Sequence, residues 1–223
     1  MSSRRSFSEG GTRRLGVLGG TFDPVHFGHL DAADAARAAL ALDEVLFIPL
    51  HDPPHRSADP QASACHRFAM VALALAGRAG DRVSDMELQR AGSSYTWDTL
   101  HTLHEQGWDA SELFVILGAD AFGDIATWHR FPAVLDAARF AVVARPGMTI
   151  EAALARTPEL RSRVGTTITL VDAHTRDVSS STIRQRIAAG SPIDDLVPAL
   201  VARHIDANHL YTDERLHGED TGR

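Results

Sequence analysis

The chain has 223 residues, of which 44% are hydrophobic, so it is long enough to bury the core of one globular domain. Its formal net charge of -7 at pH 7 argues against a surface that binds nucleic acid or an acidic membrane, because such partners require a basic face. All 22 Lys-plus-Arg residues are arginines, so a Schiff-base or Walker-loop lysine is excluded, and any phosphate site must use Arg, His or backbone amides.

Strand and helix patterns alternate along the chain. Short apolar runs typical of buried strands occur at Leu15–Leu18, Val45–Ile48, Arg82–Met86, Leu113–Leu117, Phe140–Ala144 and Thr167–Val171. Helical patterns lie between most of them, including Asp31–Leu42, Met70–Ala79 and Thr96–Gln106, and a last helix is expected at Leu196–Asn208. The alternation predicts an α/β fold: a Rossmann-like doubly wound parallel sheet with helices on both faces and a small C-terminal helical part.

The first expected strand leads into residues 19–30, which read Gly-Gly-Thr-Phe-Asp-Pro-Val-His-Phe-Gly-His-Leu. This strand-to-helix turn suits phosphate binding, because glycines let backbone N–H groups approach closely and a helix N-terminus favours negative charge. If the helix begins near Gly28, the imidazoles of His26 and His29, three residues apart, can face the same anion.

Ligands of such sheets bind beyond the carboxyl ends of the strands. One rim should therefore gather the segments that directly follow strands, namely Gly19-Gly20, Pro49–His55, Gly118-Ala119-Asp120 and Arg145-Pro146-Gly147.

Two features between the motifs receive ordinary structural interpretations. Asp85 and Glu87 alternate as residues on a strand do and are general-base candidates, although a solvent-facing strand edge explains them equally well. Cys65 is the only cysteine, which excludes an intrachain disulfide and thiolate metal sites, and we expect it to be a small buried apolar residue.

The second informative stretch is Val178-Ser-Ser-Ser-Thr-Ile-Arg184, which precedes a helical run. Serines at this place can cap the free N–H groups of the helix, and the same N-terminus can instead cradle a phosphate. Arg184 follows Ser181 by three residues, so the two side chains can share a helix face. A helix cap is the usual outcome of a serine run, and the phosphate interpretation depends on the first motif.

Together these motifs resemble the bacterial nicotinate-nucleotide adenylyltransferases of the His-x-Gly-His nucleotidyltransferase superfamily. The family motif Gly-Gly-Thr-Phe-Asp-Pro-(Ile/Val)-His-x-Gly-His is matched at every position from Gly19 to His29. Further matches follow in family order: Pro53–Arg56, Ser94–Leu100, Gly118-x-Asp120, Trp128, Ala144–Gly147 and Asn208-x-Leu210-Tyr211. The resemblance covers about residues 13–211 and implies one nucleotidyltransferase domain there, with flexible segments at 1–12 and 212–223.

The second motif departs from the family's usual Ile-Ser-Ser-Thr-x-Ile-Arg. Aligned on Arg184, it has Val178 for the isoleucine and Ser181 for the threonine, so a hydroxyl is retained. In the alternative register Thr182 is the family threonine, which places Arg184 one residue too close. Which hydroxyl of Ser180, Ser181 and Thr182 contacts phosphate stays open. Arg56 replaces a lysine common in relatives and keeps its charge.

The resemblance implies that a phosphate oxygen of nicotinate mononucleotide attacks the α-phosphorus of ATP, giving deamido-NAD and pyrophosphate. It makes His26, His29 and Arg184 the catalytic residues, and an in-line displacement needs just such positioning and charge stabilisation. The implied ATP-binding residues are Gly19, Gly20, Thr21, Phe22, His26, His29, Gly118, Ser180, Ser181 and Arg184. Mg²⁺ is expected with ATP, held mainly by phosphates and water, with no metal ligand in the protein.

The resemblance also implies an acceptor site. Trp128 would stack on the nicotinate ring, amides of Tyr95 and Thr96 would bind its carboxylate, and Asp120 would meet ribose hydroxyls, with Arg145 and Arg56 as phosphate partners. Without the resemblance, partial burial in the core would be the simpler interpretation of Trp128.

Alternative functions remain open at this point. One is an adenylyltransferase of the same fold that prefers nicotinamide mononucleotide or another phosphorylated acceptor, and another is a non-catalytic nucleotide-binding regulator. A dinucleotide-dependent dehydrogenase is disfavoured, because no Gly-x-Gly-x-x-Gly follows the first strand. No apolar run approaches the length of a membrane span, so we expect a cytoplasmic protein without membrane or nucleic-acid partners. A homo-oligomer is neither indicated nor excluded.

Overall fold

The fold is described by a computed structural model that covers residues 13–51, 60–90, 92–144, 154, 157–173 and 175–212. Four sequence-based expectations lie outside these described residues: the N-terminal segment 1–12, nearly all of the tail 212–223, and the candidate phosphate partners Arg56 and Arg145.

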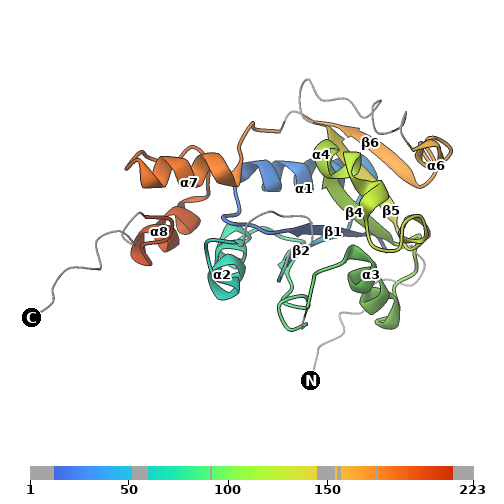
Figure 1. The fold of residues 1–223 in the computed structure, drawn as a ribbon, viewed down its shortest axis with the longest axis horizontal. Helices are drawn as coiled ribbons and strands as arrows, with labels where there is room; N and C mark the ends of the chain where they lie inside the picture. The colour runs from blue at the N-terminus through green and yellow to red at the C-terminus, as the bar shows by residue number, and fades with distance from the viewer. Residues whose placement is uncertain are drawn as a thin grey trace, which may run out of the picture.

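A six-stranded sheet forms the centre of the molecule, with strand order β3-β2-β1-β4-β5-β6 (Figure 1). Every neighbouring pair is parallel. The strands are β1 (Leu15–Gly20), β2 (Glu44–Pro49), β3 (Asp81–Val83), β4 (Leu113–Gly118), β5 (Arg139–Ala144) and β6 (Ile168–Asp172). The order reverses direction between β1 and β4, and ligands of doubly wound sheets bind at such a switch point. The predicted α/β class and parallel sheet are therefore confirmed.

Helices cover both faces of the sheet. They are α1 (Phe27–Leu40), α2 (Ala64–Ala74), α3 (Thr96–Glu105), α4 (Ala119–Gly123), α6 (Pro158–Arg161), α7 (Ser180–Ala188) and α8 (Ala199–Ala207), with 3-10 turns at Ile125–Thr127 and Ala133–Asp136. Figure 1 shows α7 and α8 together at one end of the molecule, opposite α6. They form the predicted C-terminal helical part.

Alternation along the strands divides the core into two layers. In β4, Phe114 and Ile116 face a cluster with α1, α2, α7 and α8, whereas Val115 and Leu117 face a second cluster with α3 and α4. The four inner strands are buried on both faces and read as continuous apolar runs, whereas the edge strands β3 and β6 expose part of their residues.

Several predicted boundaries were wrong. The third strand ends at Val83 instead of Met86, because the Ser84 hydroxyl accepts a hydrogen bond from Met86 N–H at 3.3 Å and the chain turns. Helix α2 begins at Ala64, where Ser63 caps it by accepting from His66 N–H, and ends at Ala74 instead of Ala79. Helix α1 already begins at Phe27, and α8 begins only after Pro198.

Cys65 was also predicted wrongly, since it is exposed. It lies in the first turn of α2, where the buried face is formed by Arg67, Met70, Val71 and Ala74, so the thiol points away from the core. Among the described residues, no helix is both long and apolar enough to cross a membrane.

Candidate active site

A cavity of about 450 Å³ opens at the switch point of the sheet, within the size range of small-molecule sites. Its floor comes from the ends of β1 and β4, including Gly19, Gly20 and Gly118. Of the residues predicted for the two substrates, the cavity brings together these: Gly19, Gly20, Thr21, His26, His29, Tyr95, Thr96, Gly118, Asp120 and Trp128. Residues predicted for ATP and residues predicted for nicotinate mononucleotide thus line one cavity.

His26 and His29 form a stacked pair at the start of α1. Their ring centroids lie 3.7 Å apart with planes inclined by 28°. The backbone N–H of His26 donates to Nδ1 of His29 at 3.2 Å, so the neutral His29 ring carries its proton on Nε2. His26 is buried, whereas His29 is half-buried, and both line the cavity. The pair can therefore offer a hydrogen-bond donor to an anion beside a helix N-terminus.

Two neighbours hold this pair in place. Phe22 does not line the cavity; it lies behind His29, with ring centroids 4.9 Å apart and an edge-on angle of 73°. Phe22 adopts φ of +50°, which is unusual for a residue with a side chain and marks a constrained turn. A Cβ at Gly28 would lie 3.1 Å from Nδ1 of His26, which explains why glycine stands between the histidines.

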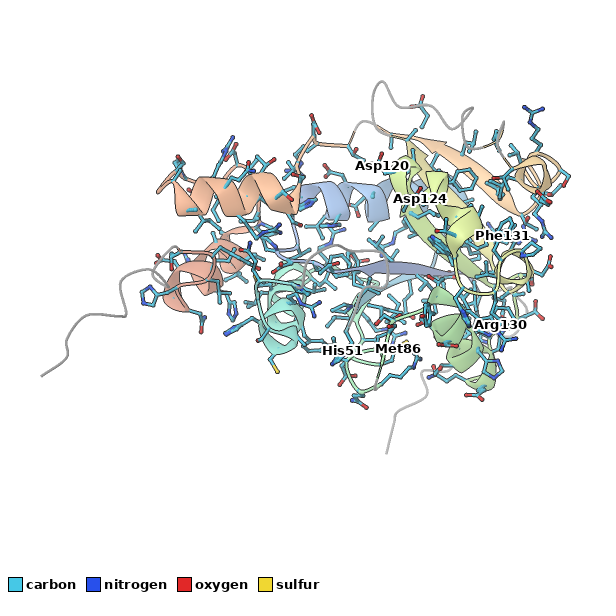
Figure 2. All side chains as sticks on the ribbon, viewed as in Figure 1. His51, Met86, Asp120, Asp124, Arg130 and Phe131 are labelled. Carbon is cyan, nitrogen blue, oxygen red and sulfur yellow. The ribbon has the colours of Figure 1, made fainter. Side chains whose placement is uncertain are left out.

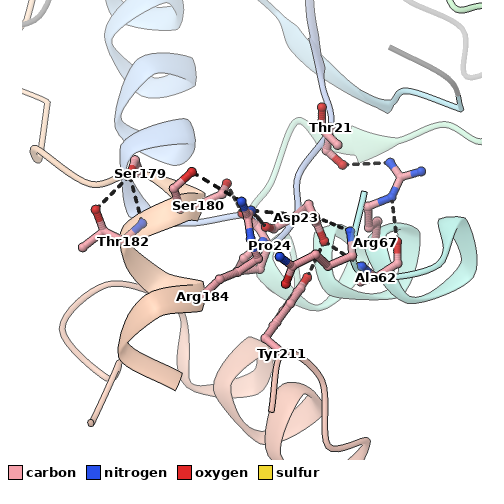
Figure 3. A network of polar contacts seen from close by, with 12 residues as sticks. Thr21, Asp23, Pro24, Ala62, Arg67, Ser179, Ser180, Thr182, Arg184 and Tyr211 are labelled. Atoms are coloured by element: carbon pink, nitrogen blue, oxygen red, sulfur yellow. Dashed lines mark hydrogen bonds and ion pairs between the residues drawn. The ribbon is translucent and has the colours of Figure 1, made fainter. Parts of the chain in front are cut away.

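The Asp23 carboxylate holds the turn between β1 and α1 through hydrogen bonds (Figure 3). Its carboxylate is 2% exposed and accepts N–H groups of Gln61 at 2.8 Å and Ala62 at 3.0 Å. It also accepts the hydroxyl of Tyr211 at 2.7 Å, from a residue 188 positions later. One buried carboxylate therefore links the turn to the loop before α2 and to the last described part of the chain.

Backbone carbonyls of the same turn are bound by two arginines (Figure 3). Arg67, which is 2% exposed, donates to Thr21 O at 2.8 Å and Leu50 O at 2.7 Å. Arg184 donates to Asp23 O at 2.6 Å. These hydrogen bonds fix the backbone of the residues that precede His26 and His29.

The predicted triphosphate residues of α7 touch this turn and do not line the cavity. The Ser180 hydroxyl donates to Pro24 O at 2.9 Å, and Arg184 Nη2 donates to the Ser181 hydroxyl at 3.3 Å, so the expected shared face exists. Ser179 caps α7 by accepting from Thr182 N–H at 3.1 Å. The helix-cap interpretation of the serine run is thus confirmed for Ser179.

The other half of the cavity is aromatic and acidic. Trp128 is half-buried, and the rings of Tyr95 and His129 lie 4.5 Å apart across the cavity wall. Asp120 and Asp124, labelled in Figure 2, lie at and just after α4. Tyr95 is the N-cap of α3 and provides no side-chain cap, so the first N–H groups of this helix remain available to an anion.

Glu87 was misjudged by sequence reasoning. It does not lie on a solvent-facing strand edge but in the turn after β3, where it is 3% exposed and lines the cavity. Glu87 lies two residues after Asp85, and this spacing resembles the alternation of residues along a strand. The turn that buries Glu87 depends on the hydroxyl of Ser84. Asp124 and His129 were missed because they stand in no recognisable motif. Among the described residues, no three His, Cys, Asp or Glu side chains gather to hold a metal ion.

Comparison with known proteins identifies the family. The cytidylyltransferase-like family matches residues 17–186. A protein of Roseiflexus sp. (strain RS-1), named "Probable nicotinate-nucleotide adenylyltransferase", is 42% identical over 197 residues, which are 88% of this chain and 97% of that protein. The chain belongs to the nicotinate-nucleotide adenylyltransferase family. A relative of the same name from Desulfitobacterium hafniense (strain Y51) is 40% identical over 89% of this chain and 96% of its own length.

Solved structures support the fold of this family member. The nicotinic acid mononucleotide adenylyltransferase of Plasmodium falciparum, complexed with NaAD, superposes with a TM-score of 0.71. It is 20% identical, and the match covers 89% of this chain and 97% of that chain. The two proteins thus share the same arrangement of sheet and helices. Their low sequence identity supports a conclusion about the fold alone.

Proposed function

We propose that this protein is an adenylyltransferase that transfers AMP from ATP to nicotinate mononucleotide, giving deamido-NAD and pyrophosphate. The observation that carries the proposal is one cavity bordered by the N-termini of two helices, each of which suits an anion. One end has the stacked histidines at the N-terminus of α1, and the other has the uncapped N-terminus of α3 beside Trp128. An adenylyl transfer between two nucleotides requires both ends.

In the proposed reaction, a phosphate oxygen of nicotinate mononucleotide forms a bond to the α-phosphorus of ATP while the bond to the bridging oxygen breaks. Pyrophosphate leaves with that oxygen. His29 would donate from Nε2 to phosphate oxygens, which stabilises the charge that grows on the leaving group. His26 would support it from the buried side of the stack. No covalent intermediate with the protein is required.

Residues around the histidines would complete the ATP end. Backbone groups of Gly19, Gly20, Thr21 and Gly118 would border the nucleotide, with Phe22 holding His29. Helix α7 would contribute Ser180, Ser181 and Arg184 to the triphosphate. The bonds of Arg184 to Asp23 O and Ser181 use two of the five N–H donors of its guanidinium, so donors remain for phosphate.

The acceptor end would hold nicotinate mononucleotide. Trp128 would stack on the pyridine ring, amides at Tyr95 and Thr96 would bind its carboxylate, and Asp120 would accept ribose hydroxyls. Arg56 and Arg145 would meet its phosphate. A solved relative from Plasmodium falciparum was obtained with NaAD and another with APC, which supports a site for both nucleotide halves.

Mg²⁺ would enter as part of the substrate MgATP. The donors at the ATP end are two imidazoles and backbone groups, and Mg²⁺ prefers phosphate and water oxygens to imidazole, so this set suits an ion carried by the triphosphate. There it would offset phosphate charge.

Because these nucleotides are water-soluble, we place the reaction in the cytoplasm and propose no membrane or nucleic-acid partner.

The test is a pyrophosphate-release assay with MgATP and either nicotinate or nicotinamide mononucleotide. We expect release with both components present and faster turnover of the acid. A matched pair of variants separates the site from general damage: His29→Ala should lose activity, and His101→Ala, on the exposed face of α3, should keep it. No release with either acceptor would contradict the proposed function, and faster turnover of the amide would overturn the acid preference.

A further inference from the structure

Glu87 is a buried acid in the wall of the cavity. Its side chain is 3% exposed, and its Oε1 accepts the hydroxyl of Thr99, which is itself 2% exposed. Its Oε2 is equally buried and accepts no hydrogen bond from the described residues. A buried carboxyl with an unused oxygen is expensive unless it is protonated or meets a ligand.

The contacts of Glu87 place it at the acceptor end. Thr99 lies in the first turn of α3, and the N-terminus of this helix borders the cavity through Tyr95 and Thr96. Ser94, also in the cavity wall, accepts the backbone N–H of His51 at 3.0 Å. Figure 2 labels His51 and Met86, which mark the loops after β2 and β3 on this side. Glu87 thus stands beside the helix terminus to which an acceptor carboxylate would bind.

Burial, and not the balance of neighbouring charges, favours the neutral form of Glu87. Burial raises the pKa of the Glu87 carboxyl above its ordinary value, and the nearby Asp98 carboxylate acts in the same direction. The Thr99 hydroxyl, the nearby Ser94 hydroxyl and the positive charge of Arg90 oppose this rise in pKa without cancelling it. The other titratable groups of the cavity wall are Tyr95, Asp120, Asp124, His129, His26 and His29.

We propose that Glu87 is a specificity-determining residue. When Glu87 is protonated and neutral it admits a substrate that carries a pyridine carboxylate, and when Glu87 is ionised it excludes that substrate. This inference rests on the proposed function. A neutral Glu87 can donate a hydrogen bond toward a substrate carboxylate, whereas an ionised Glu87 repels it. A carboxamide carries no charge and is not repelled. Selection of acid over amide should therefore weaken as pH rises and Glu87 ionises.

The experiment compares kcat/KM for nicotinate and nicotinamide mononucleotides from about pH 5 to about pH 9. In the wild type we expect the acid-to-amide ratio to fall by about tenfold as Glu87 ionises. Glu87→Gln keeps the shape and an acceptor for Thr99 but cannot ionise, so its ratio should not change with pH. Titration of the substrate phosphate, which both substrates share, cancels in the ratio.

Glu105→Gln is the control, because it removes a negative charge from the exposed end of the same helix α3. It should retain the wild-type change in ratio. The same pH dependence in Glu87→Gln and wild type would overturn the inference. Loss of turnover with both substrates in the wild type would instead contradict the proposed function.

A second measurement needs neither turnover nor a folded variant. Calorimetric titration of the wild type with each mononucleotide, in buffers of different ionisation enthalpy, gives the protons taken up on binding. Near the pKa of Glu87, binding of the acid should take up more protons than binding of the amide, because the substrate carboxylate requires neutral Glu87. Equal proton uptake for the two ligands would contradict the role of Glu87.

Discussion

Replacing Tyr211 by phenylalanine tests how the end of the chain supports the site. The Tyr211 hydroxyl donates one of three hydrogen bonds to the Asp23 carboxylate, at 2.7 Å, and Asp23 is 2% exposed. Tyr211→Phe keeps the ring and creates no cavity, so the change isolates a charge-assisted hydrogen bond. Such a bond contributes about 1.5 to 3 kcal/mol to the free energy of unfolding. For a chain of this size, that predicts a Tm lower by about 3 to 12 °C.

Equilibrium unfolding in urea measures this difference directly. The midpoint should fall while the m-value stays unchanged, because the surface exposed on unfolding is the same. Tyr95→Phe is the matched control, since the Tyr95 hydroxyl makes no hydrogen bond to the described residues. A Tyr211→Phe effect below about 0.5 kcal/mol, typical of a surface substitution, would refute the argument that Asp23 depends on this hydroxyl.

The same bond predicts an alkaline limit of stability. Burial and the nearby Asp23 carboxylate raise the pKa of the Tyr211 phenol. Because the pKa is raised on folding, the contribution of the phenol to the free energy of unfolding is complete below the unfolded-state pKa of about 10. This contribution is lost as pH rises above that value. The difference in unfolding free energy between wild type and Tyr211→Phe should therefore shrink above about pH 10. A difference that grows there would contradict the assignment.

Four further substitutions, one of them a control, test other parts of the structure. His29→Ala should lower kcat by about 100-fold with little effect on the binding of ATP, because the ring acts on transition-state charge; an unchanged kcat with weaker ATP binding would contradict this. Gly16→Ala should lower the free energy of unfolding by about 1 to 3 kcal/mol in urea, because its Cβ would lie 2.9 Å from Ile116 Cδ1. Gly19→Ala, with its nearest contact at 3.8 Å, should be tolerated in that assay. Trp128→Ala should raise KM for the acceptor more than for ATP, and equal effects on both would argue against stacking.

The central sheet could be predicted because strands buried on both faces carry a signal at every residue. Helix ends were harder to locate, since they depend on single bonds such as the Ser63 cap of α2. The start of α1 is an example: the His29 ring accepts the N–H of the N-cap residue His26, and histidine is not among the residues that usually signal a helix start. The third strand was extended too far because Asp85 and Glu87 alternate like strand residues inside a turn.

The site shows the same division. Most residues predicted from the first motif line the cavity, whereas Ser180, Ser181 and Arg184 of the second motif touch the turn before α1 instead. Contacts between distant segments could not be predicted. Nothing local in the sequence links Asp23 to Tyr211, although both belong to stretches that resemble the family. Burial of Glu87 likewise depends on Thr99, twelve residues later and on another element. Partners of this kind depend on packing in three dimensions, which periodicity does not encode.

The most direct test of adenylyl transfer follows the phosphates of ATP. Protein is incubated with Mg²⁺, nicotinate mononucleotide and ATP labelled at either the α- or the γ-phosphate, and the products are separated. If AMP is transferred, the α-label appears in deamido-NAD and the γ-label in pyrophosphate, in equal molar amounts. A γ-label in the nucleotide product, or an α-label that stays in ATP, would contradict the proposed reaction.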